Sequence, residues 1–204
     1  GGDNVDNAIY NTQEVTYLEP LRQLAEKYPT YAIPGNHEYG IGGGKAVDDP
    51  KYRVADMSKE TQDMMELLGI RYLVNELEEI SVKNQSFYLF GGGELWTKNL
   101  DYSVLQQRTK NIATLGLIHN PSFILDNFPN DVDLYLSGHT HGGQIRLPFI
   151  GPLGRVDDVL PTKYYQGLNE IGPETKLFVT SGIGETGTRA RLFNPPEIVL
   201  ITLE

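Results

Sequence analysis

Short apolar segments alternate with helical and irregular segments along the chain, and this alternation constrains the fold more than any other feature of the sequence. The apolar segments are rich in Val, Ile, Leu, Phe and Tyr and are bounded by polar or glycine-containing stretches, as β-strands typically are. We expect strands at residues 71–75, 86–90, 113–118, 133–137, 175–181 and 197–203. Strands interleaved with helices predict an α/β fold.

The segments between the strands contain amphipathic patterns. Apolar residues recur at helical spacing in residues 15–29 and in residues 58–70, and Pro29 ends the first of these two segments. Ser58 is the expected N-cap of the second, because its hydroxyl can accept a hydrogen bond from a free backbone N–H. We expect helices at residues 15–29 and 58–70 and short helices near residues 101–110 and 122–128.

A glycine-rich stretch at residues 39–56 shows no periodicity and is predicted to be a long loop. It follows the extended residues 30–38 and comes directly after His37. That position makes it a candidate lid or specificity element. An insertion without a function is the alternative.

Length and composition agree with one compact unit. A chain of 204 residues that is 39% hydrophobic can bury a substantial core, and neither a repeat nor a Pro- or Ser-rich linker divides it. We therefore expect a single domain over residues 1–204. No apolar run approaches the roughly 20 residues that cross a bilayer as a helix.

Charge and cysteine content exclude several kinds of function. The formal net charge of −10 argues against binding to long nucleic acid, which requires clustered Lys and Arg. The chain has no cysteine, so disulfides, thiolate metal ligands and a cysteine nucleophile are excluded.

Each of the four histidines closely follows a predicted strand or extended segment: His37, His119, His139 and His141. Loops at strand ends are the usual ligand-binding positions of α/β sheets, so the four side chains are expected to converge. Convergent imidazoles point to a metal site. For any one of them taken alone, a surface or hydrogen-bonded core histidine is the alternative.

The pair His139 and His141 strengthens this interpretation. In an extended segment these two side chains face the same way and Thr140 faces the other, while three glycines around them let the backbone crowd a small ligand. Neutral imidazoles with oxygen ligands and no thiolate suit Mn²⁺, Fe or Zn²⁺.

Four short motifs occur in a fixed order along the chain: Gly2 with Asp3, "GNHE" from residue 35, "HNP" at His119, and "GHTH" from residue 138. Together they resemble the calcineurin-like metallophosphoesterase family. The longer stretches "SGHTHGGQIRLP" and "SGIGETGTRARLFNPPEIVLITL" resemble its bacterial YkuE/YaeI-like phosphodiesterase branch. The resemblance implies an α/β metallophosphoesterase-type sandwich of two β-sheets flanked by helices.

The resemblance also implies the ligands of two divalent metal ions. Asp3 is expected to bridge both ions, Asn36, His119 and His139 to complete one position, and His141 to bind the other. Mn, Fe or Zn would fit these ligands.

His37 is left over from this ligand set and is the implied catalytic residue, placed to stabilise charge or to protonate the leaving oxygen. The implied function is a dinuclear metal-dependent phosphoesterase. It would hydrolyse phosphodiesters or pyrophosphate-linked small or lipid substrates by attack of a metal-bound hydroxide. The alternative is a non-catalytic scaffold or binding protein on the same fold.

One motif of the family is absent. An Asp-x-His on an earlier strand supplies two ligands to the metal held by His141 in the family, and no such motif occurs here. We expect the chain to be N-terminally incomplete by on the order of 40 residues or more. An anchor or export signal would lie in that part, so the sequence leaves the location open, and a membrane or extracytoplasmic location of the complete protein is one alternative. The second metal position should then be weak in this chain, and the sequence indicates no protein partner.

Other polar residues near the motifs are candidates for lesser roles. We expect Asp6, Glu38 and Asn120 to support the site and not to bind metal. Arg189 and Arg191 are candidates for holding a phosphate oxygen, with ordinary exposed arginines as the alternative.

Overall fold

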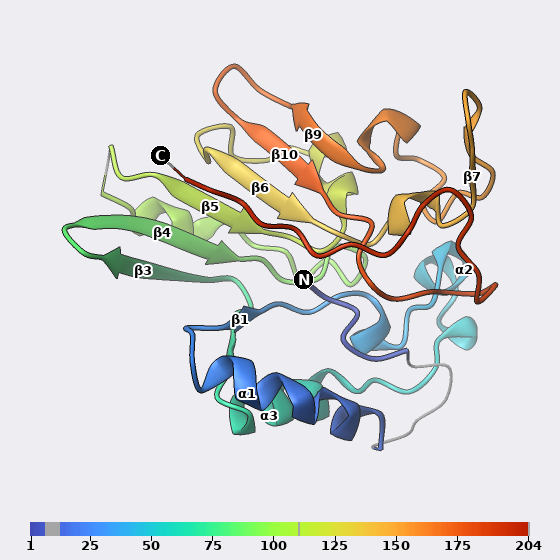
Figure 1. Ribbon diagram of the computed structural model, residues 1–204, viewed down its shortest axis with the longest axis horizontal. Helices are drawn as coiled ribbons and strands as arrows, with labels where there is room; N and C mark the ends of the chain where they lie inside the picture. Colours follow the sequence, from blue (N-terminus) through green and yellow to red (C-terminus); the bar gives the residue numbers. More distant parts are fainter. Residues whose placement is uncertain (7–12, 110, 204) are drawn as a thin grey trace.

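A computed structural model describes residues 1–6, 13–109 and 111–203 (Figure 1). Its centre is a mixed sheet of six strands in the order β3-β4-β5-β6-β10-β9. Strands β4, β5, β6 and β10 run parallel, and an antiparallel strand closes each edge. The strands are β3 (Glu76–Val82), β4 (Gln85–Gly91), β5 (Thr114–Leu117), β6 (Leu134–Ser137), β9 (Gly167–Glu170) and β10 (Lys176–Val179).

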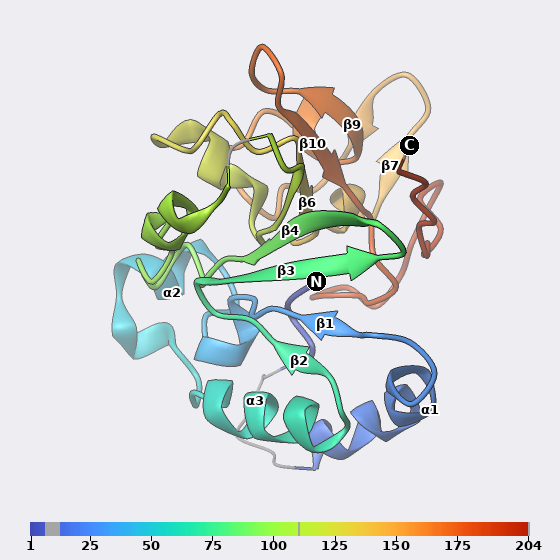
Figure 2. The same ribbon diagram turned by 90° about the vertical axis from the view of Figure 1, so that its left-hand side faces the viewer.

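Two smaller sheets accompany the central one. Strands β1 (Tyr31–Ala32) and β2 (Arg71–Tyr72) pair in parallel. Strands β7 (Arg146–Leu147) and β8 (Gly151–Pro152) form an antiparallel hairpin. Figure 2 shows β1 and β2 stacked beneath β3 and β4, with α1 and α3 on their outer side.

The helices are short, and most are 3-10 helices. The α-helices are α1 (Arg22–Ala25), α2 (Gly44–Asp48) and α3 (Ser58–Leu67). The 3-10 helices are η1 (Glu14–Leu21), η2 (His37–Tyr39), η3 (Pro50–Tyr52), η4 (Ser103–Gln107), η5 (Pro121–Leu125), η6 (His141–Gly143) and η7 (Thr162–Tyr164). None of the helices in the described part of the chain has the length and apolar content that crossing a bilayer needs.

The buried apolar clusters show how these layers pack. Ile33, Leu73 and Leu89 lie between the small parallel sheet and the six-stranded sheet. On the other face of the large sheet, Phe90 and Tyr135 pack with the residues of η4 and η5. A further cluster around Met65, Leu68 and Tyr72 joins α3 to the outer face of β1 and β2. The expected α/β sandwich of two sheets flanked by helices is confirmed.

The helix expected over residues 15–29 forms as two shorter pieces, η1 and α1. Pro20 lies inside this segment and has no backbone N–H, so it interrupts the hydrogen-bond ladder of an α-helix. The second expected helix forms as α3, but Ser58 is its first residue and Met57 is its N-cap. Asp56 supplies the cap instead, because its carboxylate accepts the Ser58 N–H at 2.9 Å.

Five of the six expected strands are present, and the two short helices form as η4 and η5. The strand expected at residues 197–203 is wrong. The segment pairs with no strand in the described chain, and Ile198 and Leu200 are more than nine-tenths exposed. Strand β3 was not expected because it carries three glutamates, which an edge strand tolerates on its open side.

The stretch at residues 39–56 is not the irregular loop expected, since it contains α2 and η3. Backbone hydrogen bonds return it to its own start, from Val54 to Gly40 and from Met57 to Glu38. The chain therefore leaves the residues around His37 and comes back to them. A lid role for this stretch stays a prediction.

Candidate metal centre

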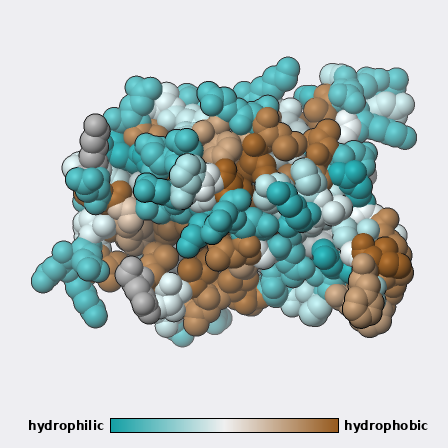
Figure 3. All heavy atoms as spheres, turned by 90° about the horizontal axis from the view of Figure 1, so that it is seen from above, coloured by the Kyte–Doolittle hydropathy of each residue, from teal (hydrophilic) through white to brown (hydrophobic). Residues whose placement is uncertain are grey.

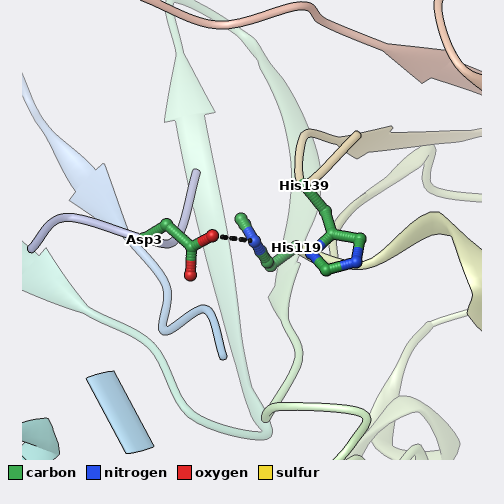
Figure 4. Close-up of side chains that lie close together, drawn as sticks. All are labelled: Asp3, His119 and His139. Atoms are coloured by element: carbon green, nitrogen blue, oxygen red, sulfur yellow. Dashed lines mark ion pairs between the residues drawn. The ribbon is translucent and has the colours of Figure 1, made fainter. Parts of the chain in front are cut away.

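Three side chains from separate parts of the chain meet in the centre of the molecule, as Figure 4 shows. They are Asp3 in the first residues, His119 after β5 and His139 after β6. One potential ligand atom of each lies within 4.8 Å of the others. Both histidines are buried. No other group of three Asp, Glu, His or Cys side chains approaches this closely in residues 1–6, 13–109 and 111–203.

The hydrogen bonds of the two imidazoles leave one nitrogen of each for another ligand. Nδ1 of His119 lies 2.7 Å from the carbonyl oxygen of Gly1, and Nδ1 of His139 lies 2.9 Å from Oδ1 of Asn36. Because these oxygens can only accept, each Nδ1 must donate. In a neutral ring the lone pair is then on Nε2. For His119, whose Nε2 faces Asp3, this is the arrangement of a metal-binding histidine.

Both Nε2 atoms are buried without a hydrogen-bond partner. Nε2 of His119 lies 2.9 Å from Oδ2 of Asp3, so the two residues form an ion pair when His119 is protonated, although their alignment is not that of a hydrogen bond. Nε2 of His139 has no such partner, and a buried polar atom left unpaired is costly. This donor set fits a divalent transition metal or zinc ion.

Burial and neighbouring charges set the ionisation of the three groups. Burial is the largest single effect and would raise the pKa of Asp3, but His119, His37 and His139 together outweigh it, and the pKa lies below its ordinary value. Burial opposes protonation of His119, whereas Asp3 favours it, and the pKa of His119 is raised. Burial, reinforced by His119, lowers the pKa of His139 to about 3. Without metal, the site therefore holds one ion pair and one neutral imidazole.

The carboxylate of Glu38 holds Asp3 in position. Its Oε2 accepts the backbone N–H of Gly35 at 2.6 Å and that of Asp3 at 3.1 Å, and its Oε1 accepts the N–H of Asn4. Oδ1 of Asp3 in turn accepts the backbone N–H of His37 at 2.9 Å. The loop carrying Asp3 and the turn before η2 are therefore joined as one unit.

Gly35 allows this close approach of two backbones. A Cβ atom at Gly35 would lie 2.3 Å from the backbone nitrogen of Asp3, which no side chain could tolerate. Burial, and then the charge of Asp3, raise the pKa of Glu38. Glu38 is fully buried and accepts hydrogen bonds from three backbone N–H groups. Both facts agree with the supporting role expected for it. Asn120 also acts on the backbone, since its side chain caps η5 by accepting the N–H of Ser122.

Asn36 and His37 are adjacent in the chain, but their side chains make different contacts. Asn36 is buried and contacts the group of three through His139, while its amide donates to the carbonyl of Ile41. The ring of His37 is largely buried, with Nδ1 3.5 Å from Oδ1 of Asp6. The structure thus places Asn36 against a candidate ligand, and His37 beside the group and outside it.

His141 does not join the three ligand atoms, although it is two residues from His139. The expectation of an extended segment is wrong, because His139 and His141 have φ angles of 62° and 50°, in the left-handed region. Thr140 points away, as expected, and donates its hydroxyl to the carbonyl of Tyr165. The partly exposed ring of His141 places Nδ1 3.2 Å from the carbonyl of Gly184, and burial lowers its pKa.

The glycines after His141 serve packing and not a ligand. A Cβ atom at Gly143 would lie 2.2 Å from Cβ of Pro152, so this glycine lets the β7–β8 hairpin lie against η6. The expectation that all the glycines of this motif crowd a small ligand is therefore wrong for Gly143.

The two arginines considered as phosphate ligands have protein partners. Arg191 donates to the carbonyl of Ser181 at 2.8 Å and to that of Gly182 at 3.3 Å. Arg189 is exposed and lies 3.3 Å from Oδ2 of Asp6. Arg191 thus organises the loop after β10, and Asp6 connects Arg189 with His37.

No sequence pattern predicts the part played by Trp96. Its ring meets the ring of His139 edge to face, with centroids 4.7 Å apart and planes at 86°. This contact restricts the orientation of His139. The available signal is that the chain's only tryptophan follows a strand that ends beside the site.

Comparison with known proteins relates this arrangement to an established family. A family model described as calcineurin-like phosphoesterase matches residues 1–143. The chain is 32% identical to phosphodiesterase YaeI of Escherichia coli, over 92% of this chain and 63% of that protein. It is 30% identical to the uncharacterized metallophosphoesterase YkuE of Bacillus subtilis, over 100% of this chain and 66% of that protein.

An uncharacterized metallophosphoesterase of Aquifex aeolicus is also 30% identical, with 100% of this chain and 70% of that protein covered. The chain spans less than two thirds of the length of YaeI and YkuE. The search of solved structures found no significant match.

Proposed function

Because the chain belongs to the calcineurin-like phosphoesterase family, we propose that it is a metal-dependent phosphoesterase whose site is built on Asp3, His119 and His139. One observation carries this proposal. Potential ligand atoms of the three side chains converge within 4.8 Å, and both histidines are buried. Two buried imidazoles beside a carboxylate are a donor set that a divalent ion binds.

The residues of the site suit a divalent ion. Asp3 contributes a negative charge, and a ring nitrogen of each histidine contributes a lone pair. Asn36 lies close enough to offer its amide oxygen, which now holds Nδ1 of His139. Divalent ions bound here would neutralise the phosphate and acidify a water molecule that attacks it. With no cysteine in the chain, Mn, Fe or Zn is the expected choice.

We propose that His37 acts on the leaving group as a general acid. Its backbone N–H holds Asp3, and its ring lies next to the site without belonging to the group of three. A histidine in that position can deliver a proton to the departing alkoxide. The second metal position would use Asp3 together with His141, whose Nδ1 faces a carbonyl oxygen and whose Nε2 is therefore the available ligand.

The proposed substrates are phosphodiesters or pyrophosphate-linked molecules of small size or with a lipid part. One relative is named a phosphodiesterase. The formal net charge of −10 disfavours a polyanionic substrate such as long DNA.

A second candidate function is a non-catalytic binding protein on this fold. One observation favours it, namely that the described residues hold a single group of three ligand side chains and leave His141 outside it. The two candidates differ in turnover, which a binding protein lacks even when metal is bound.

The experiment that tests the proposal follows hydrolysis of a small aryl phosphodiester by the protein after chelation and after reloading with Mn²⁺ or Zn²⁺. The proposal requires activity that chelation abolishes and metal restores, and that Asp3→Asn lowers by about 100-fold or more. Asp126→Asn on the surface is the control and should keep full activity. Bound metal without turnover in the unaltered protein would favour the binding protein, and faster cleavage of DNA than of the small diester would overturn the substrate class.

A further inference from the structure

The tip of the β7–β8 hairpin exposes large apolar side chains. Phe149 is completely exposed, Ile150 is 71% exposed and Leu153 is 58% exposed. Phe193 is 67% exposed and borders the same shallow groove as the tip. Figure 3 shows apolar side chains gathered at the right-hand end of the molecule, where β7 lies in Figure 1. A projecting apolar cluster of this kind marks a contact surface on a soluble domain.

The base of the hairpin is bonded to the chain around it. The backbone N–H of Arg146 donates to the carbonyl of Leu192 at 2.9 Å, and that of Leu192 donates to the carbonyl of Gln144 at 3.2 Å. Pro152 packs against the backbone of Gly143. The exposed tip therefore stands on a supported base, directly after η6.

Two arginines accompany the tip in an acidic protein. Residues 142–156 contain Arg146 and Arg155 and no acidic residue, although Asp157 and Asp158 follow directly. The formal net charge of the whole chain is −10. Arg146 and Arg155 donate to the carbonyls of Gly142 and Leu160, and neither forms an ion pair with a described residue.

We propose that the β7–β8 hairpin docks the protein on the surface of an anionic lipid bilayer, with Phe149 and Ile150 entering the interface and the arginines facing the headgroups. Aromatic and aliphatic side chains flanked by arginine are the combination that binds such interfaces. At physiological salt, charges act over about 8 Å, so Arg146 and Arg155 act on a surface that the tip contacts.

Docking in this way has a consequence for the metal centre. The hairpin begins three residues after η6, and the side chain of Asn194, next to Phe193, donates to the carbonyl of His141. The bilayer would therefore lie beside the loop that carries His139 and His141. The proposal does not depend on the proposed function, because binding is measured without turnover.

A site-specific label tests the proposal, and the absence of cysteine makes the labelling unambiguous. Ile150→Cys, carrying an environment-sensitive fluorophore, is mixed with vesicles of phosphatidylglycerol and phosphatidylcholine. We expect a saturable blue shift that high salt weakens and that pure phosphatidylcholine does not produce. Val82→Cys is the control, since it is 54% exposed near the turn of the β3–β4 hairpin, and it should show no shift.

Sedimentation with the same vesicles supplies a second measurement. Phe149→Ser combined with Ile150→Ser should lower the partition coefficient at least about tenfold, and Arg155→Gln about three- to fivefold. Val82→Ser and Lys27→Gln should leave it unchanged, and circular dichroism verifies that each variant is folded. An unshifted label at residue 150, equal shifts at both labels, or unchanged binding of the double variant would overturn the proposal. So would self-association through the tip without vesicle binding.

Discussion

The carboxylate of Glu38 accepts the backbone N–H of Asp3 at 3.1 Å, and the same oxygen accepts the N–H of Gly35 at 2.6 Å. One buried side chain thus positions the candidate metal ligand relative to the turn that carries Asn36 and His37. The geometry of the metal centre depends on this residue, although it donates no atom to the ligand group.

Replacing Glu38 should therefore weaken metal binding without removing a ligand. Glu38→Gln keeps the shape but replaces one accepting oxygen by an amide nitrogen, which leaves a buried N–H unsatisfied. We expect metal affinity to fall about 10–100-fold and the free energy of unfolding to fall by about 1–3 kcal/mol. Calorimetric titration and chemical denaturation measure the two effects. The exposed Glu79→Gln is the control, and a Glu38 variant as tight and stable as that control would refute the role.

The two histidines of the "GHTH" motif should differ in their effect on metal binding. A ring nitrogen of His139 belongs to the converging group, whereas His141 lies outside it. His139→Ala should lower the affinity for the first metal ion by about 100-fold or more, beyond the loss caused by a supporting residue. His141→Ala should leave that first ion bound. Equal losses of the tightly bound ion in both variants, measured by elemental analysis after dialysis, would contradict this difference.

His37 should affect turnover and not metal content. Its ring lies beside Asp6 and outside the ligand group. His37→Ala should lower kcat by about 100-fold or more, which is the usual effect of losing a general acid. The metal content of the protein and its affinity for metal should stay nearly unchanged. A diester with a better leaving group should suffer less, because it needs less protonation. Loss of metal from this variant would show that His37 is a ligand.

The packing of η4 and η5 against the large sheet can be tested by comparing two phenylalanines. Phe90 is fully buried in β4, whereas Phe149 is fully exposed at the hairpin tip. Phe90→Ala should lower the free energy of unfolding by about 3–5 kcal/mol, and Phe149→Ala should change it by less than about 0.5 kcal/mol. Denaturation curves followed by circular dichroism measure both. Similar losses in the two variants would contradict the described core.

The sequence predicts the parallel strands well because their two buried faces require continuous apolar runs, as in β5 and β6. It predicts edge strands poorly. Glu76 and Glu78 of β3 pair with Arg71 of β2, and only Glu79 is exposed. No local pattern reveals that β3 will pair with Gln85–Gly91. Residues 197–203 have the apolar composition of a strand but no neighbouring strand in the described chain. Strand propensity is realised only where a partner exists.

The same limit applies to the metal centre. The order of the motifs is enough to predict that Asp3, His119 and His139 converge, since loops after neighbouring parallel strands end at the same edge. The different placement of His141 follows from two left-handed φ angles, which the local sequence does not specify. The contact of Trp96 with His139 depends on tertiary packing alone.

The most direct test of the metal centre is an anomalous-difference map from crystals of the protein grown with Mn²⁺. We expect a peak about 2.0–2.3 Å from Nε2 of His119, a ring nitrogen of His139 and a carboxylate oxygen of Asp3. A map without a peak between these three side chains, or with its strongest peak on other residues while both imidazoles stay unbound, would contradict the account.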